Sequence, residues 1–201
     1  MSDTSPTAVL DPFTLEIVKA KLLAIAEEMS VVLARTSMSP IVYEVLDFAC
    51  GLTDPDGQVI AQANGLTLFT GTFAAQVQSV TKKFRLAGIR PGDIFMTNGP
   101  YDGGTHTCDI ALIMPVFTES VIVACAVSIT HWTEVGGNQP GRASRAARRD
   151  CRRYAAGRGQ LTRGQRLPSV VCSFWTAGSS SPRALSAACS KAPGFWAVAG
   201  P

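Results

Sequence analysis

The sequence has 201 residues, 46% of them hydrophobic, a formal net charge of +3 and six cysteines without a CxxC pair. This composition suits one domain of ordinary size, or a piece of something larger, and we expect it in the cytoplasm with reduced thiols. No apolar run approaches the length that spans a bilayer, so we expect no membrane partner. The start MSDTSPTAVLDP is too polar and acidic for a signal or transit peptide, and residues 1–10 are expected to be flexible.

Two segments have the periodicity of amphipathic helices. The first begins at Asp11-Pro12, where Asp suits the N-cap and Pro the first helical position, and runs to about Ala34, ahead of Pro40. We expect it to pack on its own domain rather than on a partner, through a stripe at spacings of three and four: Leu15, Val18, Leu22, Ile25, Met29 and Val32. The second helix is closed by Gly88 and carries the stripe Phe73, Val77, Val80 and Phe84.

The other apolar segments predict strands. Residues 45–62 have the pattern of strand, turn and strand about residues 54–57 (DPDG), and a short strand is expected at 94–97. Two stronger apolar runs, residues 109–117 and 121–130, are separated by only three residues, which predicts a β-hairpin. The expected fold class is α+β, with two amphipathic helices packed on a mainly antiparallel sheet.

The hairpin would bring together two loops that are distant in sequence. Folding it about residue 119 sets residue 109 opposite 129 and residue 107 opposite 131, where opposed Cβ atoms lie about 5 Å apart. One loop is residues 103–109 (GGTHTCD), and the other is residues 131–137 (HWTEVGG). They hold His106 and His131, the only two histidines of the chain, so we expect both imidazoles at one end of the hairpin.

His106, Asp109 and His131 are the candidate metal ligands. Two imidazoles and one carboxylate suit Mn, Zn or Fe and leave positions open for water or substrate. Glu134 is the candidate catalytic residue, as a base that activates water or as a partner that orients a histidine. Cys108 could be a thiolate ligand but is expected to point inward as a small apolar group. The alternative is that both histidines are ordinary hydrogen-bonded loop residues.

Other site chemistries find less support. Residues 98–104 (NGPYDGG) are glycine-rich but match neither a P-loop nor the GxGxxG fingerprint, so we expect no nucleotide site in this chain. No GxSxG elbow is present for a serine nucleophile.

Residues 142–201 differ in composition from the rest. Residues 1–141 contain 7 Lys/Arg and 14 Asp/Glu (net −7), whereas 142–201 contain 11 Lys/Arg and the single acid Asp150 (net +10). This low-complexity tail is rich in Arg, Ala, Ser and Gly and is expected to be disordered. We favour a frameshift, because a GC-rich gene read out of frame has this composition. A native extension ranks second and a nucleic-acid arm last, since the arginines follow no lasting period, and we expect no nucleic-acid partner.

Several motifs in order give residues 9–141 a resemblance to the N-terminal part of the hydantoinase B/oxoprolinase family, which includes N-methylhydantoinase, 5-oxoprolinase and acetone carboxylase subunits. They are residues 11–16 (DPFTLE), 24–29 (AIAEEM), 47–48 (DF), 90–93 (RPGD), 100–101 with 103–106 (PY, GGTH) and 131–137 (HWTEVGG). The segment 11–141 is therefore interpreted as the N-terminal part of such a domain. The sequence departs from the family pattern at Gly99, where an acid is usual.

The resemblance implies a function and a ligand set. His106, Asp109 and His131 would be the metal ligands of a hydrolase that opens a hydantoin, 5-oxoproline or lactam ring. ATP would be used by a larger hydantoinase A-like partner subunit, not by this chain. Carboxylation of a ketone, as in acetone carboxylase, is the alternative, and the 201-residue fragment alone is expected to be inactive.

Overall fold

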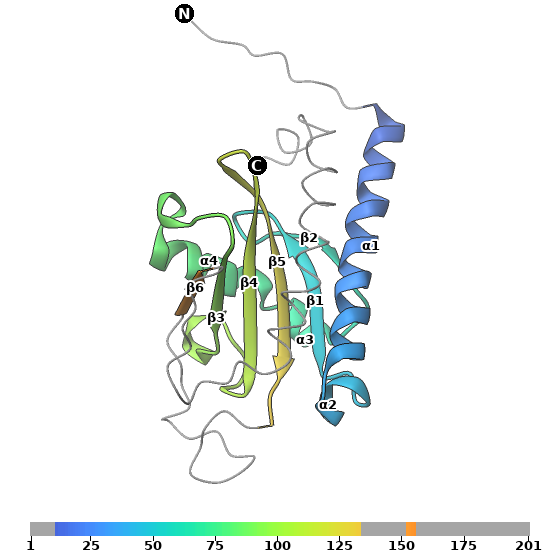
Figure 1. Ribbon diagram of the computed structural model, residues 1–201, viewed down its shortest axis with the longest axis vertical. Helices are drawn as coiled ribbons and strands as arrows, with labels where there is room; N and C mark the ends of the chain where they lie inside the picture. Colours follow the sequence, from blue (N-terminus) through green and yellow to red (C-terminus); the bar gives the residue numbers. More distant parts are fainter. Residues whose placement is uncertain (1–10, 134–151, 156–201) are drawn as a thin grey trace, which may run out of the picture.

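The fold is built on one antiparallel sheet. The computed structural model describes residues 11–133 and 152–155, and its sheet has the strand order β2-β1-β5-β4-β3-β6 (Figure 1). Every neighbouring pair is antiparallel. With the helices packed on it, this sheet confirms the predicted α+β class. The strands are β1 (Phe48–Thr53), β2 (Val59–Gln62), β3 (Asp93–Thr97), β4 (Asp109–Thr118), β5 (Val121–His131) and β6 (Arg152–Ala155).

The first predicted helix is α1 (Pro12–Thr36), two residues longer than expected. Asp11 caps it, since its carboxylate accepts a hydrogen bond from the backbone N–H of Thr14 at 3.2 Å. The helix ends before Pro40, which opens the short helix α2 (Pro40–Tyr43). Its apolar face lies against β1 and β2, so the helix packs on its own domain as predicted. Four members of the predicted stripe are buried with Ala26 and Leu33, whereas Leu15 and Val32 are half-buried; the four are Val18, Leu22, Ile25 and Met29.

The second predicted helix is α4 (Phe73–Phe84), which is followed by a 3-10 turn at Leu86–Gly88. Phe73, Val77 and Val80 are buried, and the ring of Phe84 packs 4.8 Å from that of Phe95 on β3. The sequence did not predict α3 (Thr67–Thr70), because one turn is too short to show a helical period.

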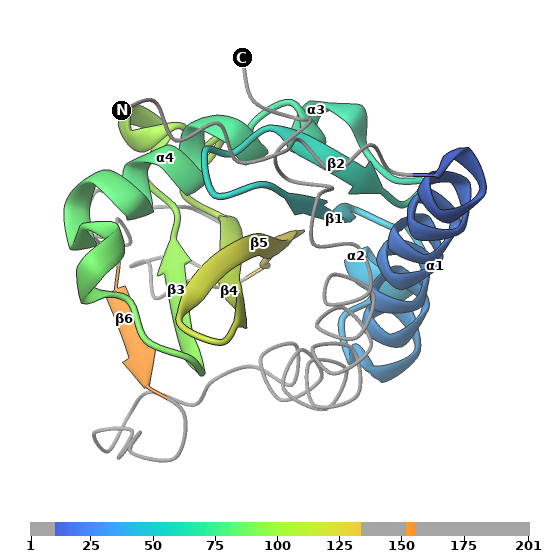
Figure 2. The same cartoon turned by 90° about the horizontal axis from the view of Figure 1, so that it is seen from above.

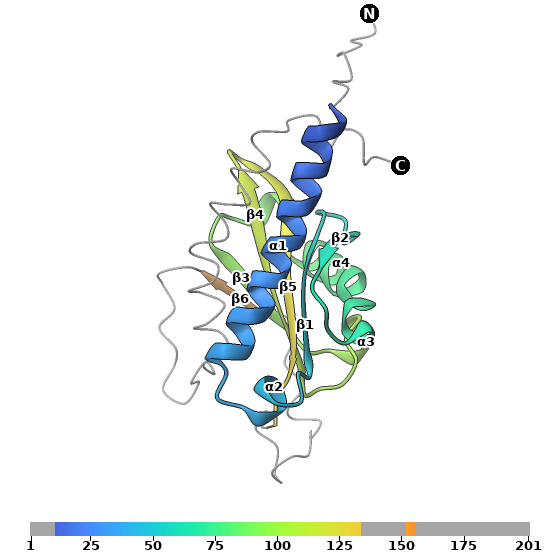
Figure 3. The same ribbon diagram turned by 90° about the vertical axis from the view of Figure 1, so that its right-hand side faces the viewer.

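The helices cover opposite faces of the sheet, as Figures 2 and 3 show, with α1 on one side and α3 and α4 on the other. Strand side chains alternate between these faces and form two cores. The α1 side includes Leu22, Leu52, Ile110 and Leu112. The α4 side includes Phe73, Val77, Phe95, Ile113 and Ile129. None of the helices in residues 11–133 is long and apolar enough to cross a membrane.

The β4–β5 hairpin forms as predicted, but its register differs by two residues. Asp109 lies opposite His131 and not opposite Ile129. One residue of the shift arises because Thr118 pairs with Val121, which centres the fold between residues 119 and 120. The other arises from an irregularity between Val116 and Phe117, where β5 carries one extra residue. A shift of two keeps side chains on the same face, so the convergence expected of the two loops survives the correction.

Four residues of the basic tail are among those described. Arg152–Ala155 form β6, an edge strand beside β3 in which Asp93 pairs with Ala155 and Met96 with Arg152. For these four residues the structure shows a strand where disorder was expected. The flexibility expected of residues 1–10 and of the remaining tail concerns residues outside those described.

Candidate functional site

The ends of β4 and β5 bring the three predicted ligands together. Asp109 is the first residue of β4, His131 is the last of β5, and the two are directly paired. His106 lies three residues earlier, in the loop that returns from β3. Two backbone bonds fix this end of the sheet: the His131 N–H donates to the Asp47 carbonyl at 3.1 Å, and the Trp132 N–H donates to the Cys108 carbonyl at 2.9 Å.

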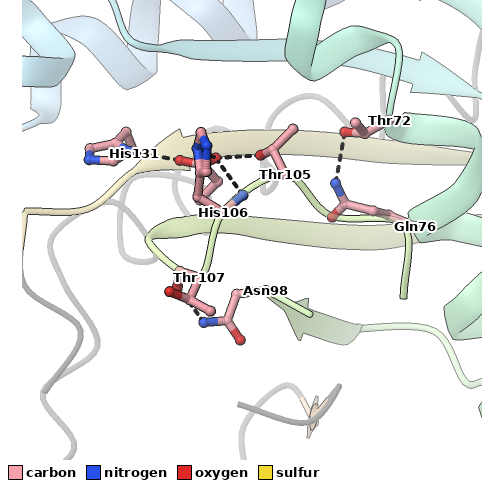
Figure 4. Close-up of polar contacts among 8 residues, drawn as sticks. Thr72, Gln76, Asn98, Thr105, His106, Thr107 and His131 are labelled. Carbon is pink, nitrogen blue, oxygen red and sulfur yellow. Dashed lines mark hydrogen bonds and ion pairs between the residues drawn. The ribbon is translucent and has the colours of Figure 1, made fainter. Parts of the chain in front are cut away.

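The Asp109 carboxylate joins the two imidazoles. His131 Nδ1 lies 2.7 Å from Oδ1, and His106 Nδ1 lies 3.0 Å from Oδ2. Oδ2 also accepts from the His106 backbone N–H at 3.0 Å and from the Thr105 hydroxyl. Figure 4 shows the side chains of Thr105, His106 and His131 converging on this point. Because a carboxylate only accepts hydrogen bonds, each imidazole donates from Nδ1 in this arrangement.

Burial decreases steeply across the cluster. The Asp109 side chain is 2% exposed, that of His131 30% and that of His106 73%. Burial by itself raises the pKa of the Asp109 carboxyl. The hydrogen bonds from Thr105, His131 and the His106 backbone, with the charge of His131, outweigh burial and hold that pKa below its ordinary value. The site therefore consists of the buried anion of Asp109 and, beside it, the solvent-accessible imidazole of His106.

The three side chains are close, but they do not surround one point. His106 and His131 contact different carboxylate oxygens, and among residues 11–133 no three His, Cys, Asp or Glu side chains are arranged as ligands of one metal ion. The predicted proximity is thus present. The metal-binding role of His106, Asp109 and His131 stays a prediction.

The two other candidates differ in outcome. Cys108 is buried in the α1-side core with Ile110, as expected for a small apolar group, whereas Asp109 points to the opposite face. Glu134 lies outside the described residues, so its catalytic role stays a prediction.

The loop before Asp109 contains a site residue that sequence reasoning missed, Thr105. Its hydroxyl reaches the carboxylate four residues later. A threonine in a glycine-rich loop just before an aspartate is a weak signal, because hydroxyl–carboxylate contacts depend on how the loop closes. The loop is also tied to the end of β3, since Asn98 Nδ2 donates to the Thr107 carbonyl at 2.6 Å (Figure 4).

The loop closes through Gly103, and Gly103→Ala is expected to be destabilising. Gly103 has φ +93°, and an added Cβ would lie 2.6 Å from the Cβ of Ala75 on α4. We expect Gly103→Ala to lower the free energy of unfolding by about 1–3 kcal/mol, measured by chemical denaturation. Gly88→Ala is the matched control, because nothing lies within 4 Å of its added Cβ. Equal stability of the two variants would contradict this account of the loop.

The fold and the cluster define the chain as an α+β protein with a histidine–carboxylate site at one end of a central hairpin. Residues 11–150 match the family described as hydantoinase B/oxoprolinase. The chain belongs to this family, which confirms the resemblance seen in the sequence.

Two curated relatives illustrate the match. 5-Oxoprolinase 1 of Arabidopsis thaliana is 38% identical over 133 residues, which are 66% of this chain and 10% of that protein. A putative D-/L-hydantoinase B subunit of Pseudomonas sp. (strain NS671) is 32% identical over 135 residues, covering 66% of this chain and 23% of that protein. The chain thus spans less than a quarter of the length of either.

Two solved structures share the fold. The ATP-dependent caprolactamase of Pseudomonas jessenii superposes with a TM-score of 0.79 over 91% of this chain and 35% of its own, at 24% identity. The nucleotide-free structure of acetone carboxylase, an enzyme of ATP-dependent acetone carboxylation, gives a TM-score of 0.61 over 65% of this chain and 17% of its own, at 25% identity.

Proposed function

We propose that this chain supplies the metal-binding part of an ATP-dependent hydrolase that opens a cyclic amide, such as a hydantoin, 5-oxoproline or lactam ring. The observation that carries the proposal is the meeting of His106, Asp109 and His131 at one end of the β4–β5 hairpin. Membership of the hydantoinase B/oxoprolinase family supports the hydrolase class. The free thiols of Cys50, Cys108 and Cys125 suit the cytoplasm, where we place the protein.

The donor set fits a divalent cation. Two imidazoles and one carboxylate are the ligands that Fe, Mn and Zn take in open catalytic sites, and the buried anion of Asp109 would offset the charge of such an ion. A cation held there would polarise the ring carbonyl or activate water. The exposed His106 ring can adjust to a ligand, while Asp109 and His131 stay fixed by the ends of β4 and β5.

ATP is assigned in this proposal to a hydantoinase A-like partner subunit. Two amides of the glycine-rich loop that could be mistaken for a phosphate cradle are used inside the loop. The Asp102 and Gly104 N–H groups donate to the Gly99 carbonyl at 2.9 and 3.0 Å. Amides committed in this way are not available to a phosphate. The similarity to a putative hydantoinase B subunit supports an arrangement of two different chains.

Glu134 is proposed as the base, or as a partner that orients a histidine.

Carboxylation of a ketone is the second candidate, favoured by the structural similarity to acetone carboxylase. The two functions differ in their second substrate, because ring opening consumes water and carboxylation consumes bicarbonate. The 201-residue chain is combined with an ATP-binding hydantoinase-type subunit, ATP and Mn²⁺. Each of 5-oxoproline, hydantoin and caprolactam is assayed for ring opening, and acetone with labelled bicarbonate is assayed for fixed label.

ATP-dependent ring opening that is lost in Asp109→Asn supports the hydrolase. If labelled bicarbonate is fixed and no ring is opened, the carboxylase function replaces the hydrolase function. If the two chains form a complex and neither product appears, both functions are rejected. We expect the chain alone to bind metal without turnover, since the described residues leave His106 largely exposed. Turnover by the chain alone would show that no partner is needed.

Metal binding should stabilise the fold by an amount that grows with the logarithm of the free metal concentration once this exceeds the dissociation constant. At 100 times the dissociation constant, a cation that binds only the folded chain adds about 2.7 kcal/mol to the free energy of unfolding. We therefore expect Mn²⁺ to raise the melting temperature by several degrees and EDTA to reverse the rise. In His131→Gln the rise should be absent. A rise of equal size in that variant would place the bound ion elsewhere.

A further inference from the structure

The two oxygens of the Asp109 carboxylate have unequal surroundings. Oδ2 faces three donors from the loop before β4: the Thr105 hydroxyl, the His106 backbone N–H and His106 Nδ1. Oδ1 faces His131 Nδ1 at 2.7 Å, on the neighbouring strand. A carboxylate held through one oxygen by several donors cannot turn freely about its Cβ–Cγ bond, so the direction of Oδ1 is fixed by what holds Oδ2.

Of the three donors to Oδ2, the Thr105 hydroxyl is the one that depends on the identity of a well-fixed side chain. The His106 N–H is a backbone group that any residue except proline would supply, and the His106 ring is 73% exposed. The Thr105 hydroxyl is carried by a loop fixed at both ends. Gly103 packs against α4 before it, and Asn98 Nδ2 donates to the Thr107 carbonyl after it.

We propose that Thr105 is a positioning residue: its hydroxyl holds Oδ2 of Asp109 so that Oδ1 faces His131 and the proposed cation. This rests on the metal site of the proposed function and adds to it a side chain that does not touch the ion. Partners that orient a ligand in this way typically change metal affinity by about 10- to 100-fold when they are removed.

The test uses two substitutions and a matched control in the 201-residue chain. Thr105→Val keeps the side-chain shape but removes the donor, and Thr105→Ser keeps the donor. Thr107→Val makes the same change two residues later, where the bond from Asn98 uses the backbone carbonyl. Mn²⁺ binding is titrated by electron paramagnetic resonance, and thermal unfolding shows whether each variant is folded.

We expect Thr105→Val to weaken Mn²⁺ binding by about 10-fold or more, while Thr105→Ser and Thr107→Val stay within about 3-fold of the unchanged chain. If Thr105 were only structural, its substitution would lower the stability of the fold, and the Mn²⁺ affinities of Thr105→Val and Thr105→Ser would not differ in this way. Unchanged Mn²⁺ affinity in a folded Thr105→Val chain overturns the proposal.

A second readout separates failure of this inference from failure of the metal site. Imidazole ¹⁵N NMR of the metal-free chain reports whether His131 carries its proton on Nδ1, as its bond to the carboxylate requires. If the unchanged chain binds no Mn²⁺, the metal site fails. The position of the His131 ring proton, as seen by NMR, then decides the role of Thr105. Loss of the Nδ1-protonated form in Thr105→Val, but not in Thr105→Ser, supports it, and an unchanged pattern in Thr105→Val refutes it.

Discussion

Asp109→Asn is expected to weaken Mn²⁺ binding by about 100-fold or more, the largest functional effect expected of a single change among the described residues. The carboxylate is the only anion of the proposed ligand set, and it contacts both imidazoles. An asparagine preserves the shape of the side chain but replaces one acceptor oxygen with an NH₂ group. In either orientation this donor would face another hydrogen-bond donor, from His131 or from the loop before β4. Isothermal titration with Mn²⁺ measures the effect.

The matched control is Asp56→Asn, the same change at an exposed position in the turn between β1 and β2. It should bind Mn²⁺ like the unchanged chain. If both variants bind equally well, Asp109 is not a ligand, and the histidine–carboxylate cluster is then a hydrogen-bonded loop anchor.

Phe73→Ala is expected to lower the free energy of unfolding by about 3–5 kcal/mol, the largest effect on stability. Phe73 is 0% exposed at the first turn of α4. Its ring lies so close to Gly51 of β1 that an added Cβ there would stand 2.7 Å from Phe73 Cε2. Removing the ring leaves a cavity between the sheet and α4, the helix against which the Gly103 loop also packs. Urea denaturation measures the loss.

Phe13→Ala provides the comparison, because Phe13 is 81% exposed at the start of α1. It should change the free energy of unfolding by no more than about 0.5 kcal/mol. A similar loss in both variants would mean that the α4-side core does not hold the fold together as described.

Local patterns in the sequence were sufficient for most of the fold. The Asp11 cap and the stripe through Val18 and Leu22 predicted α1, since both signals act within a few residues. The hairpin followed from two apolar runs with a short gap. Its register could not be predicted, because half of the shift comes from the centre of the turn and half from one extra β5 residue opposite Val116 and Phe117, and neither leaves a pattern in the sequence.

The site was partly predictable for the same reason. A hairpin necessarily brings the start of one run near the end of the next, so the meeting of His131 with the residue 103–109 loop followed from sequence alone. The division of the Asp109 oxygens between Thr105 and His131 did not, because it depends on the path of a loop closed by Gly103 against Ala75. Gly103 and Ala75 are distant in sequence, and their contact corresponds to no periodic pattern of residues in the sequence.

Anomalous X-ray scattering from a crystal of the Mn²⁺-loaded chain tests the central claim most directly. The account predicts one strong manganese peak per chain, within coordination distance of a ring nitrogen from each of His106 and His131 and of an Asp109 oxygen. A peak bound by other residues, or none there at saturating Mn²⁺ while the imidazoles keep their bonds to Asp109, would contradict it.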